Sequence, residues 1–307
     1  VLDPFRGTTS EFPFPSGFEG LTMMRQFSDE SDILLIGTNL GLHIVSMENG
    51  LPELDSMLSI EIGQVSDILP LHSTSGDLDI LLTGGDRAWK LALSSNLQFL
   101  ENPPIATEIT PLSSLLMESN ATAISSAHID LPGRTPLLII GTDVGLVAWN
   151  TTDGSDDLGL PWWVFNRENS EDFVTPNILD SAKSASVNSI EVVFDQNGGN
   201  AVWIGTGGGL HLLDLNIIIS QPEQAFQNDR MLNMEGLLTG ANDIQSILPL
   251  EGMIVVGSRD GTWCLEGDSS GILGMFQNQT EFPGLVSSMA TLHREGELWL
   301  FVGISPG

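Results

Sequence analysis

Two of the chain's ten basic residues, Arg87 and Arg259, each lie beside an aspartate in a short turn between apolar stretches. An exposed guanidinium in so acidic a protein could bind a carboxylate or a sulfate through two parallel hydrogen bonds. The alternative is a local ion pair that closes the turn, because exposed ion pairs are common and contribute little. If the chain binds a ligand, we expect the binding residues in these turns and in the equivalent ones. They are Asn39, Asp86, Arg87, Asp143, Arg259 and Asp260.

The histidines suggest a second chemistry, which is metal binding. When the repeats described below are aligned, three of the five histidines share one position with a glutamate. These residues are His72, His128, His293 and Glu251. Imidazole and carboxylate suit Zn²⁺, but its ligands must lie within about 2.0–2.3 Å, and a six-fold arrangement separates non-adjacent repeats. We therefore predict polar residues at a solvated strand end, with no metal and no cofactor. We expect His43 and His211, which share another position, to be packed within strands.

The sequence lacks the local motifs of several enzyme classes. It has no G-x-S-x-G elbow, no phosphate-binding loop and no H-E-x-x-H motif. It also has no tyrosine, which excludes a sialidase-type tyrosine nucleophile. A carboxylate pair for glycoside cleavage leaves no local motif, so a polysaccharide hydrolase or lyase with such a pair at a channel mouth remains an alternative. We identify no catalytic residue.

A repeated hairpin must position the residues named above. Residues 200–214 read NAVWIGTGGGLHLLD, which is an apolar run, a glycine, a short turn and a second apolar run. This pattern predicts two half-buried strands around a turn whose glycines can adopt backbone angles that other residues resist, and replacement of Gly205 should destabilise the blade if positive φ is needed there. Related stretches start at Ile33, Ile80, Leu137, Met253 and Leu298. The glycines that anchor the six copies are Gly37, Gly84, Gly141, Gly205, Gly257 and Gly303.

Each repeat has room for four strands. The anchor spacing runs from 46 residues (257 to 303) to 64 residues (141 to 205), in or just above the range of propeller blades. A β-like segment precedes each hairpin, as in Val187–Ile190, and a shorter one follows. We predict an all-β, six-bladed β-propeller of four-stranded antiparallel blades, in one domain over residues 1–307. Seven blades also suit the length, but no seventh anchor is found.

Both ends of the chain match parts of a blade. The C-terminal copy stops where a third strand should begin, and Val1-Leu2-Asp3 resembles the end of the Leu210–Asp214 strand. We therefore predict that strands from both termini close the last blade, which leaves no open seam. The non-Met start favours a processed or excised segment, and we expect a module of a larger surface protein.

The motif around Gly205 resembles a known family. Asn188-Ser189-Ile190, then residues 195–200, then Val202-Trp203-Ile204-Gly205-Thr206 and Gly209-Leu210 look like the two-component-regulator propeller repeat. The resemblance covers nearly the whole chain and is weakest around Gly84 and Gly303. It implies an extracytoplasmic sensor or recognition propeller, located at the cell surface, in the periplasm or outside the cell.

The amino-acid composition limits the classes of partner that the chain can bind. The net charge is −30 because the chain has only ten lysines and arginines against 40 aspartates and glutamates. Such a surface repels nucleic acids and anionic membranes, and no apolar run approaches the roughly 20 residues of a membrane helix. The single cysteine, Cys264, excludes an internal disulfide.

These observations favour non-catalytic recognition. Repeated blades present variable turns on a rigid frame, which suits binding and requires no chemistry. We expect a ligand-binding or protein-interaction propeller that is monomeric within a larger chain or assembly and binds a glycan or another protein. A purely structural assembly module is a third possibility.

Overall fold

The computed structural model describes two compact units, residues 1–109 and residues 110–307. The described residues are 2–3, 8–9, 21–26, 33–48, 51–72, 78–93, 103–109, 111–117, 120–129, 137–150, 161, 163–165, 186–194, 200–207, 209–215, 220, 243–250, 252–258, 261–268, 271–275, 285–294 and 297–305. Arg259 and Asp260 of the predicted binding turns lie outside these residues. The single domain over residues 1–307 stays a prediction.

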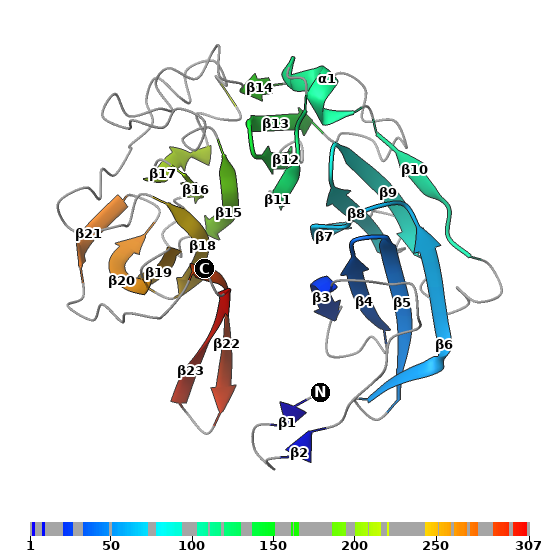
Figure 1. The fold of residues 1–307 in the computed structure, drawn as a ribbon. Helices are drawn as coiled ribbons and strands as arrows, with labels where there is room; N and C mark the ends of the chain where they lie inside the picture. The colour runs from blue at the N-terminus through cyan, green and yellow to red at the C-terminus, as the bar shows by residue number, and fades with distance from the viewer. Residues whose placement is uncertain are drawn as a thin grey trace. The chain divides into compact units, whose positions relative to one another are not determined.

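Unit 1 contains two four-stranded antiparallel sheets in which consecutive strands are neighbours (Figure 1). The first comprises β3 (Leu21–Gln26), β4 (Ile33–Thr38), β5 (Gly41–Glu48) and β6 (Leu51–Glu61). The second comprises β7 (Asp67–His72), β8 (Leu78–Gly84), β9 (Arg87–Leu93) and β10 (Ala106–Glu108). A separate hairpin pairs β1 (Leu2–Asp3) with β2 (Thr8–Thr9).

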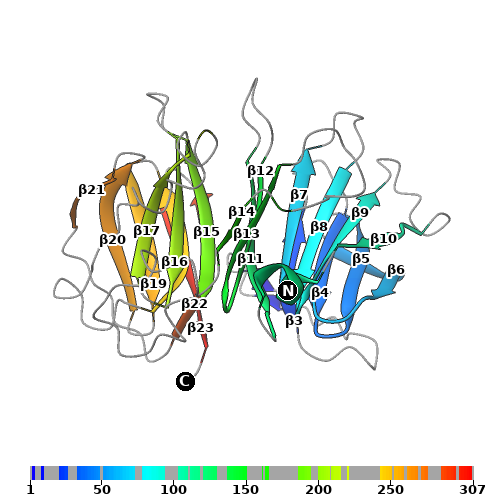
Figure 2. The ribbon, with the colours of Figure 1, turned by 90° about the horizontal axis from the view of Figure 1, so that it is seen from above.

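Unit 2 contains four further sheets of the same meander order. The first comprises β11 (Ala123–Ile129), β12 (Leu137–Thr142), β13 (Gly145–Asn150) and β14 (Trp163–Phe165), and the short helix α1 (Leu112–Leu116) precedes it. The second comprises β15 (Val187–Phe194), β16 (Asn200–Thr206) and β17 (Gly209–Asp214), which run side by side in Figure 2. The third comprises β18 (Ile244–Leu250), β19 (Met253–Ser258), β20 (Gly261–Asp268) and β21 (Gly271–Met275). The last comprises β22 (Leu285–Arg294) and β23 (Glu297–Ser305).

The all-β prediction and the repeated hairpins are confirmed. The six anchor glycines lie in six different sheets, each in the second strand of its sheet. Blade number and ring closure stay predictions. Among the described strands, β1 pairs with β2 and β23 pairs with β22, as two separate two-stranded sheets. In the same part of the chain, no helix combines the length and the hydropathy required to span a bilayer.

In three of the hairpins, a threonine follows the anchor glycine and its hydroxyl stabilises the turn. Two residues separate the second strand from the third, and the buried hydroxyl of Thr142 satisfies polar groups of that turn. It donates to the carbonyl oxygen of Gly145 (3.0 Å) and accepts from the amide of Val144 (3.2 Å). Thr38 and Thr206 donate to their own turn glycines at 3.0 and 3.1 Å. A short polar side chain therefore stabilises the turn by replacing water on buried backbone groups.

The anchor glycines have a different role from the one predicted for Gly205. The φ of Gly205 is not positive. Positive values occur instead at three glycines that begin third strands, which are Gly145, Gly209 and Gly261. A Cβ on Gly205 would lie 2.6 Å from Cγ2 of Ile244, which belongs to the next sheet. In the same way, a Cβ added to Gly141 would lie 2.4 Å from Cγ1 of Val187. A Cβ added to Gly257 would lie 2.5 Å from Cγ1 of Val286. These glycines are required because the next sheet approaches too closely for any side chain.

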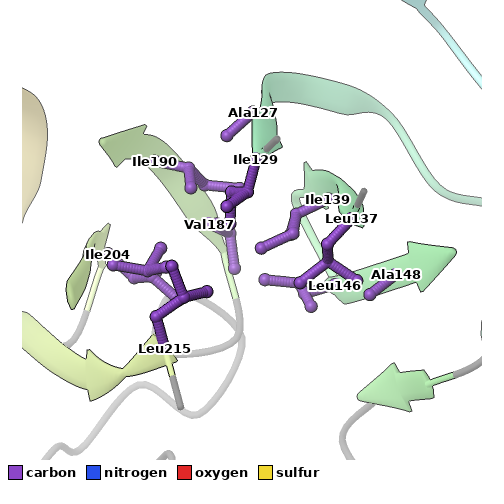
Figure 3. Packing of buried hydrophobic residues seen from close by; sticks show 11 residues of the cluster. Ala127, Ile129, Leu137, Ile139, Leu146, Ala148, Val187, Ile190, Ile204 and Leu215 are labelled. Atoms are coloured by element: carbon purple, nitrogen blue, oxygen red, sulfur yellow. The ribbon is translucent and has the colours of Figure 1, made fainter. Parts of the chain in front are cut away.

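The apolar core lies between consecutive sheets of each unit. One buried cluster joins the sheet of β11 to β14 with the sheet of β15 to β17. Figure 3 shows Ile129 and Ile139 of the first sheet facing Val187 and Ile190 of the second. Equivalent clusters join the two sheets of unit 1, and the sheets that contain β16 and β19 in unit 2. Apolar side chains on both sides of β8, β12, β16 and β19 are buried, so these second strands are covered on both faces.

Candidate functional site

In unit 1, two hairpin turns and one connecting segment form a continuous surface, which we call the turn ledge. It comprises residues 38–40, 61–66 and 84–87. The segment between β6 and β7 binds the first turn through two hydrogen bonds, Gly63 N to Leu40 O (3.1 Å) and Val65 N to Thr38 O (2.9 Å). It then binds the second hairpin through Ser66 N to Thr83 O (2.6 Å). Backbone hydrogen bonds therefore join the two turns through one segment.

Close packing of the backbone further restricts the conformation of the turn ledge. A Cβ on Gly84 would lie 1.8 Å from the carbonyl oxygen of Gln64, so the hairpin and the segment are in direct backbone contact. Gly63 has a φ of 91° and Gly85 a φ of 52°, values that favour glycine and sharply turn the chain. The ledge thus presents its side chains from a hydrogen-bonded frame, which lowers the entropy that binding would cost.

The predicted residues Asn39, Asp86 and Arg87 all lie on this ledge. Asn39 is exposed, and its neighbour Leu40 is a large apolar side chain that is 46% exposed. Arg87 donates from Nη1 to Oε2 of Glu108 at 3.0 Å, with both side chains about half exposed. This ion pair reaches β10, 21 residues away, whereas the alternative weighed from the sequence was a local pair that closes the turn. Because both groups remain solvated, the pair contributes little stability and leaves a charged surface at the second turn.

Asp143 has a structural role. Its Oδ1 accepts a hydrogen bond from the amide of Thr122 (2.7 Å), and its own amide donates to the carbonyl of Thr122 (3.0 Å). These two bonds fasten the β12–β13 turn to the residues that lead into β11. Asp143 belongs to unit 2, whereas the turn ledge belongs to unit 1.

The predicted packing of His43 and His211 is confirmed, since both are fully buried in third strands. Nδ1 of His43 lies 3.0 Å from Oγ of Ser59, and Nε2 of His211 lies 3.2 Å from Oγ1 of Thr206. Burial lowers the pKa of His43 below its usual value of 6.5, because the charged imidazolium loses its hydration. Within the described ranges, no group of three or more His, Cys, Asp or Glu side chains could hold a metal ion.

Sequence reasoning missed the polar side chains that join neighbouring sheets in unit 2. Asn188 donates from Nδ2 to the carbonyl of Ile244 (2.8 Å), and Oγ of Ser189 accepts from the amide of Ile247 (3.2 Å). A β-bulge between Val187 and Ser189 turns these groups toward the next sheet. The recurring serine in the first strands was the available signal for this contact.

A partly buried ion pair was missed as well. Nζ of Lys90 lies 3.4 Å from Oδ2 of Asp79, and their side chains are only 12% and 18% exposed. Lys90 is one of just two lysines in the chain. Because the two residues belong to adjacent strands, only the strand register brings them together.

Comparisons with known proteins identify a shared fold. No protein-family model matches the chain, and no curated protein matches it. Two crystal structures of BBS1N in complex with ARL6DN, one soaked with lead and one with mercury, resemble its fold. Each has a TM-score of 0.55 and 14% identity over 94% of this chain, and the match covers 77% and 78% of the other chain. At this identity the likeness shows the fold alone, and it fits a β-propeller.

Proposed function

We propose that this chain is a non-catalytic protein-interaction module built as a six-bladed β-propeller. The observation that carries the proposal is the fold likeness, over 94% of the chain, to a structure in which BBS1N is bound to ARL6DN. Six anchor glycines in six sheets support six blades. In this ring, β22 and β23 supply two strands of the last blade, and the N-terminal strands supply the other two.

The turn ledge is the surface we propose for binding. Its backbone is held by hydrogen bonds, and it carries an exposed apolar side chain, Leu40, and the exposed charge of Arg87, which pairs with Glu108 of β10. Protein interfaces combine apolar anchors with charged residues in this way, and arginine is enriched in them. The resemblance to two-component-regulator repeats supports an extracytoplasmic setting, which we propose with it.

A partner screen with matched variants tests this function. Partners are captured with the full chain, identified by cross-linking and mass spectrometry, purified and titrated by calorimetry. We expect Leu40→Asp to weaken binding of a genuine partner by at least about tenfold, which corresponds to about 1.4 kcal/mol. Ile105→Asp is the control, because Ile105 is 83% exposed in the same unit but lies outside the ledge.

Three results would contradict the proposal. The first is a partner that binds both variants as tightly as it binds the wild-type chain. The second is a glycan array in which the chain binds polysaccharide while no protein partner is recovered. The third is turnover of a bound polysaccharide, which would favour the hydrolase or lyase with a carboxylate pair.

A further inference from the structure

The segment that leads into β11 contains a glycosylation sequon whose asparagine is exposed. Asn120-Ala121-Thr122 fits the N-x-S/T pattern, in which the middle residue is not proline. Asn120 lies outside the strands and is exposed, whereas Ala121 beside it is buried. The nearest described residue before Asn120 is Met117, at the end of α1, and it is 82% exposed. Both residues are therefore accessible to solvent at the place where an enzyme would have to reach Asn120.

Hydrogen bonds fix the other end of this sequon. The amide of Thr122 donates to Oδ1 of Asp143 (2.7 Å), and the carbonyl of Thr122 accepts from the amide of Asp143 (3.0 Å). Both bonds use the backbone of Thr122, so the contact with Asp143 does not occupy its hydroxyl, which is the group that the sequon requires at this position. The sequon therefore holds an exposed asparagine at a defined place beside the β12–β13 turn.

The structure distinguishes this sequon from the two others in the chain, which begin at Asn150 and Asn278. Asn150 is the last residue of β13, and its backbone pairs with Leu137 of β12. An enzyme that binds the segment around Asn150 must first open this strand pair, which costs free energy. Asn278 lies outside the described residues. Of the two sequons whose asparagine the structure describes, only the one at Asn120 has its acceptor outside a strand pair.

We infer that Asn120 is an N-glycosylation site and that its donor is a lipid-linked oligosaccharide phosphate. In the transfer, Nδ2 of Asn120 forms a bond to the anomeric carbon of the first sugar while the bond from that carbon to the phosphate oxygen breaks. The phosphate leaves with the bonding electron pair, and the amide nitrogen loses one proton to a base of the transferase. The inference rests on the extracytoplasmic setting proposed above, because sequons are modified in exported proteins.

The attached glycan would cover one of the hairpin turns of unit 2. Asp143 of the β12–β13 turn is bonded to Thr122, which follows Asn120 by two residues, and two residues span at most about 7 Å. A glycan is bulky and hydrophilic, so it keeps protein surfaces away from the residues beneath it. We therefore expect a protein partner to avoid the turn that contains Asp143.

Glycan transfer to the folded chain tests the accessibility of the site. The full chain is produced in a host without N-glycosylation and incubated with a purified oligosaccharyltransferase and a lipid-linked oligosaccharide, and peptide mass spectrometry measures the modified fraction at each asparagine. Short peptides around Asn120 and Asn150 report the intrinsic preference of the enzyme. Relative to its peptide, we expect Asn120 of the folded chain to react at about the same rate and Asn150 at least about tenfold more slowly. A rate at Asn120 as depressed as the rate at Asn150 would overturn the inference.

Variants secreted with an export signal from a host that N-glycosylates test the site in a cell. Thr122→Ala removes the hydroxyl of the sequon but keeps both backbone bonds to Asp143, and Thr122→Ser retains the hydroxyl. We expect glycan at Asn120 in the wild-type chain, in Thr122→Ser and in the control Asn150→Gln, and at least a tenfold loss in Thr122→Ala. An unmodified Asn120 in the secreted wild-type chain would refute the inference.

Failure of this site and failure of the proposed function give different results. Binding at the turn ledge is measured separately with Leu40→Asp, whereas glycan occupancy is read by mass alone. An unmodified Asn120 in a chain that binds its partner through the ledge would refute only the glycosylation site. A glycosylated chain whose partner binds Leu40→Asp as tightly as it binds the wild-type chain would refute only the proposed interaction surface.

Discussion

Substitution of Gly205 by alanine tests the close approach between the second and third sheets of unit 2. The added Cβ would lie 2.6 Å from Cγ2 of Ile244, 3.2 Å from its Cβ and 3.3 Å from Cδ1 of Ile247. Since φ at Gly205 is not positive, no backbone strain is added and the cost is overpacking alone. Overpacking of a dense core costs about 1–3 kcal/mol, so we expect the free energy of unfolding to fall by that amount in urea titrations.

A double-mutant cycle isolates the clash. Ile244→Ala removes the atom that Gly205→Ala would meet, and by itself should cost about 2–5 kcal/mol. In the double variant we expect at least about 1 kcal/mol of the summed cost to be recovered, because the two residues are in contact. Gly252→Ala is the control, since Gly252 has a φ of 67° and no atom near its added Cβ. Its cost should add independently to that of Ile244→Ala. Additive costs for Gly205→Ala and Ile244→Ala would refute the close-approach explanation.

Three further outcomes are expected from the structure. Thr142→Val should lower the free energy of unfolding by about 1–3 kcal/mol, because buried polar groups of the turn lose their hydrogen-bond partner. Thr107 is exposed, so Thr107→Val should change this free energy by less than about 0.5 kcal/mol. Equal effects of the two substitutions would contradict the role of the Thr142 hydroxyl. Because the pKa of buried His43 is lowered, the unfolded chain binds more protons than the folded chain, and the free energy of unfolding should fall as pH drops below about 6.5. His43→Gln should flatten this dependence on pH in unfolding titrations at several pH values. An unchanged dependence would exclude His43 as its source. Lys90→Met should destabilise more than Arg87→Met in urea titrations, because the exposed pair is worth at most about 1 kcal/mol; the reverse order would contradict the burial argument.

The hairpins could be predicted from local sequence because their determinants lie within about 15 residues. Apolar runs specify the paired strands, and in three hairpins the short turn between them has a threonine before it and a glycine after it. The turn that contains Asp143 was therefore placed correctly from sequence. The burial of His43 and His211 could also be predicted, since both stand among apolar neighbours in a strand pattern.

The role of individual site residues depended on partners distant in sequence. Asp143 binds Thr122, and Arg87 binds Glu108, each across 21 residues, so neither contact is visible in a local motif. The turn ledge exists because the segment after β6 passes both turns and bonds to each. For Gly205, sequence reasoning identified the residue but assigned the wrong cause, because the approach of Ile244 is a property of sheet packing.

The sequence by itself determined an all-β chain of repeated hairpins, since strand period, turn residues and anchor spacing are all local or periodic features. Only the tertiary structure decided which turns carry exposed side chains, which polar groups join adjacent sheets and which apolar strand is exposed. The physical reason is that exposure is a property of the surroundings. Leu300 and Val202 occupy the same place in the repeat, yet Leu300 is 38% exposed and Val202 is completely buried, because Val202 packs in the apolar cluster between two sheets.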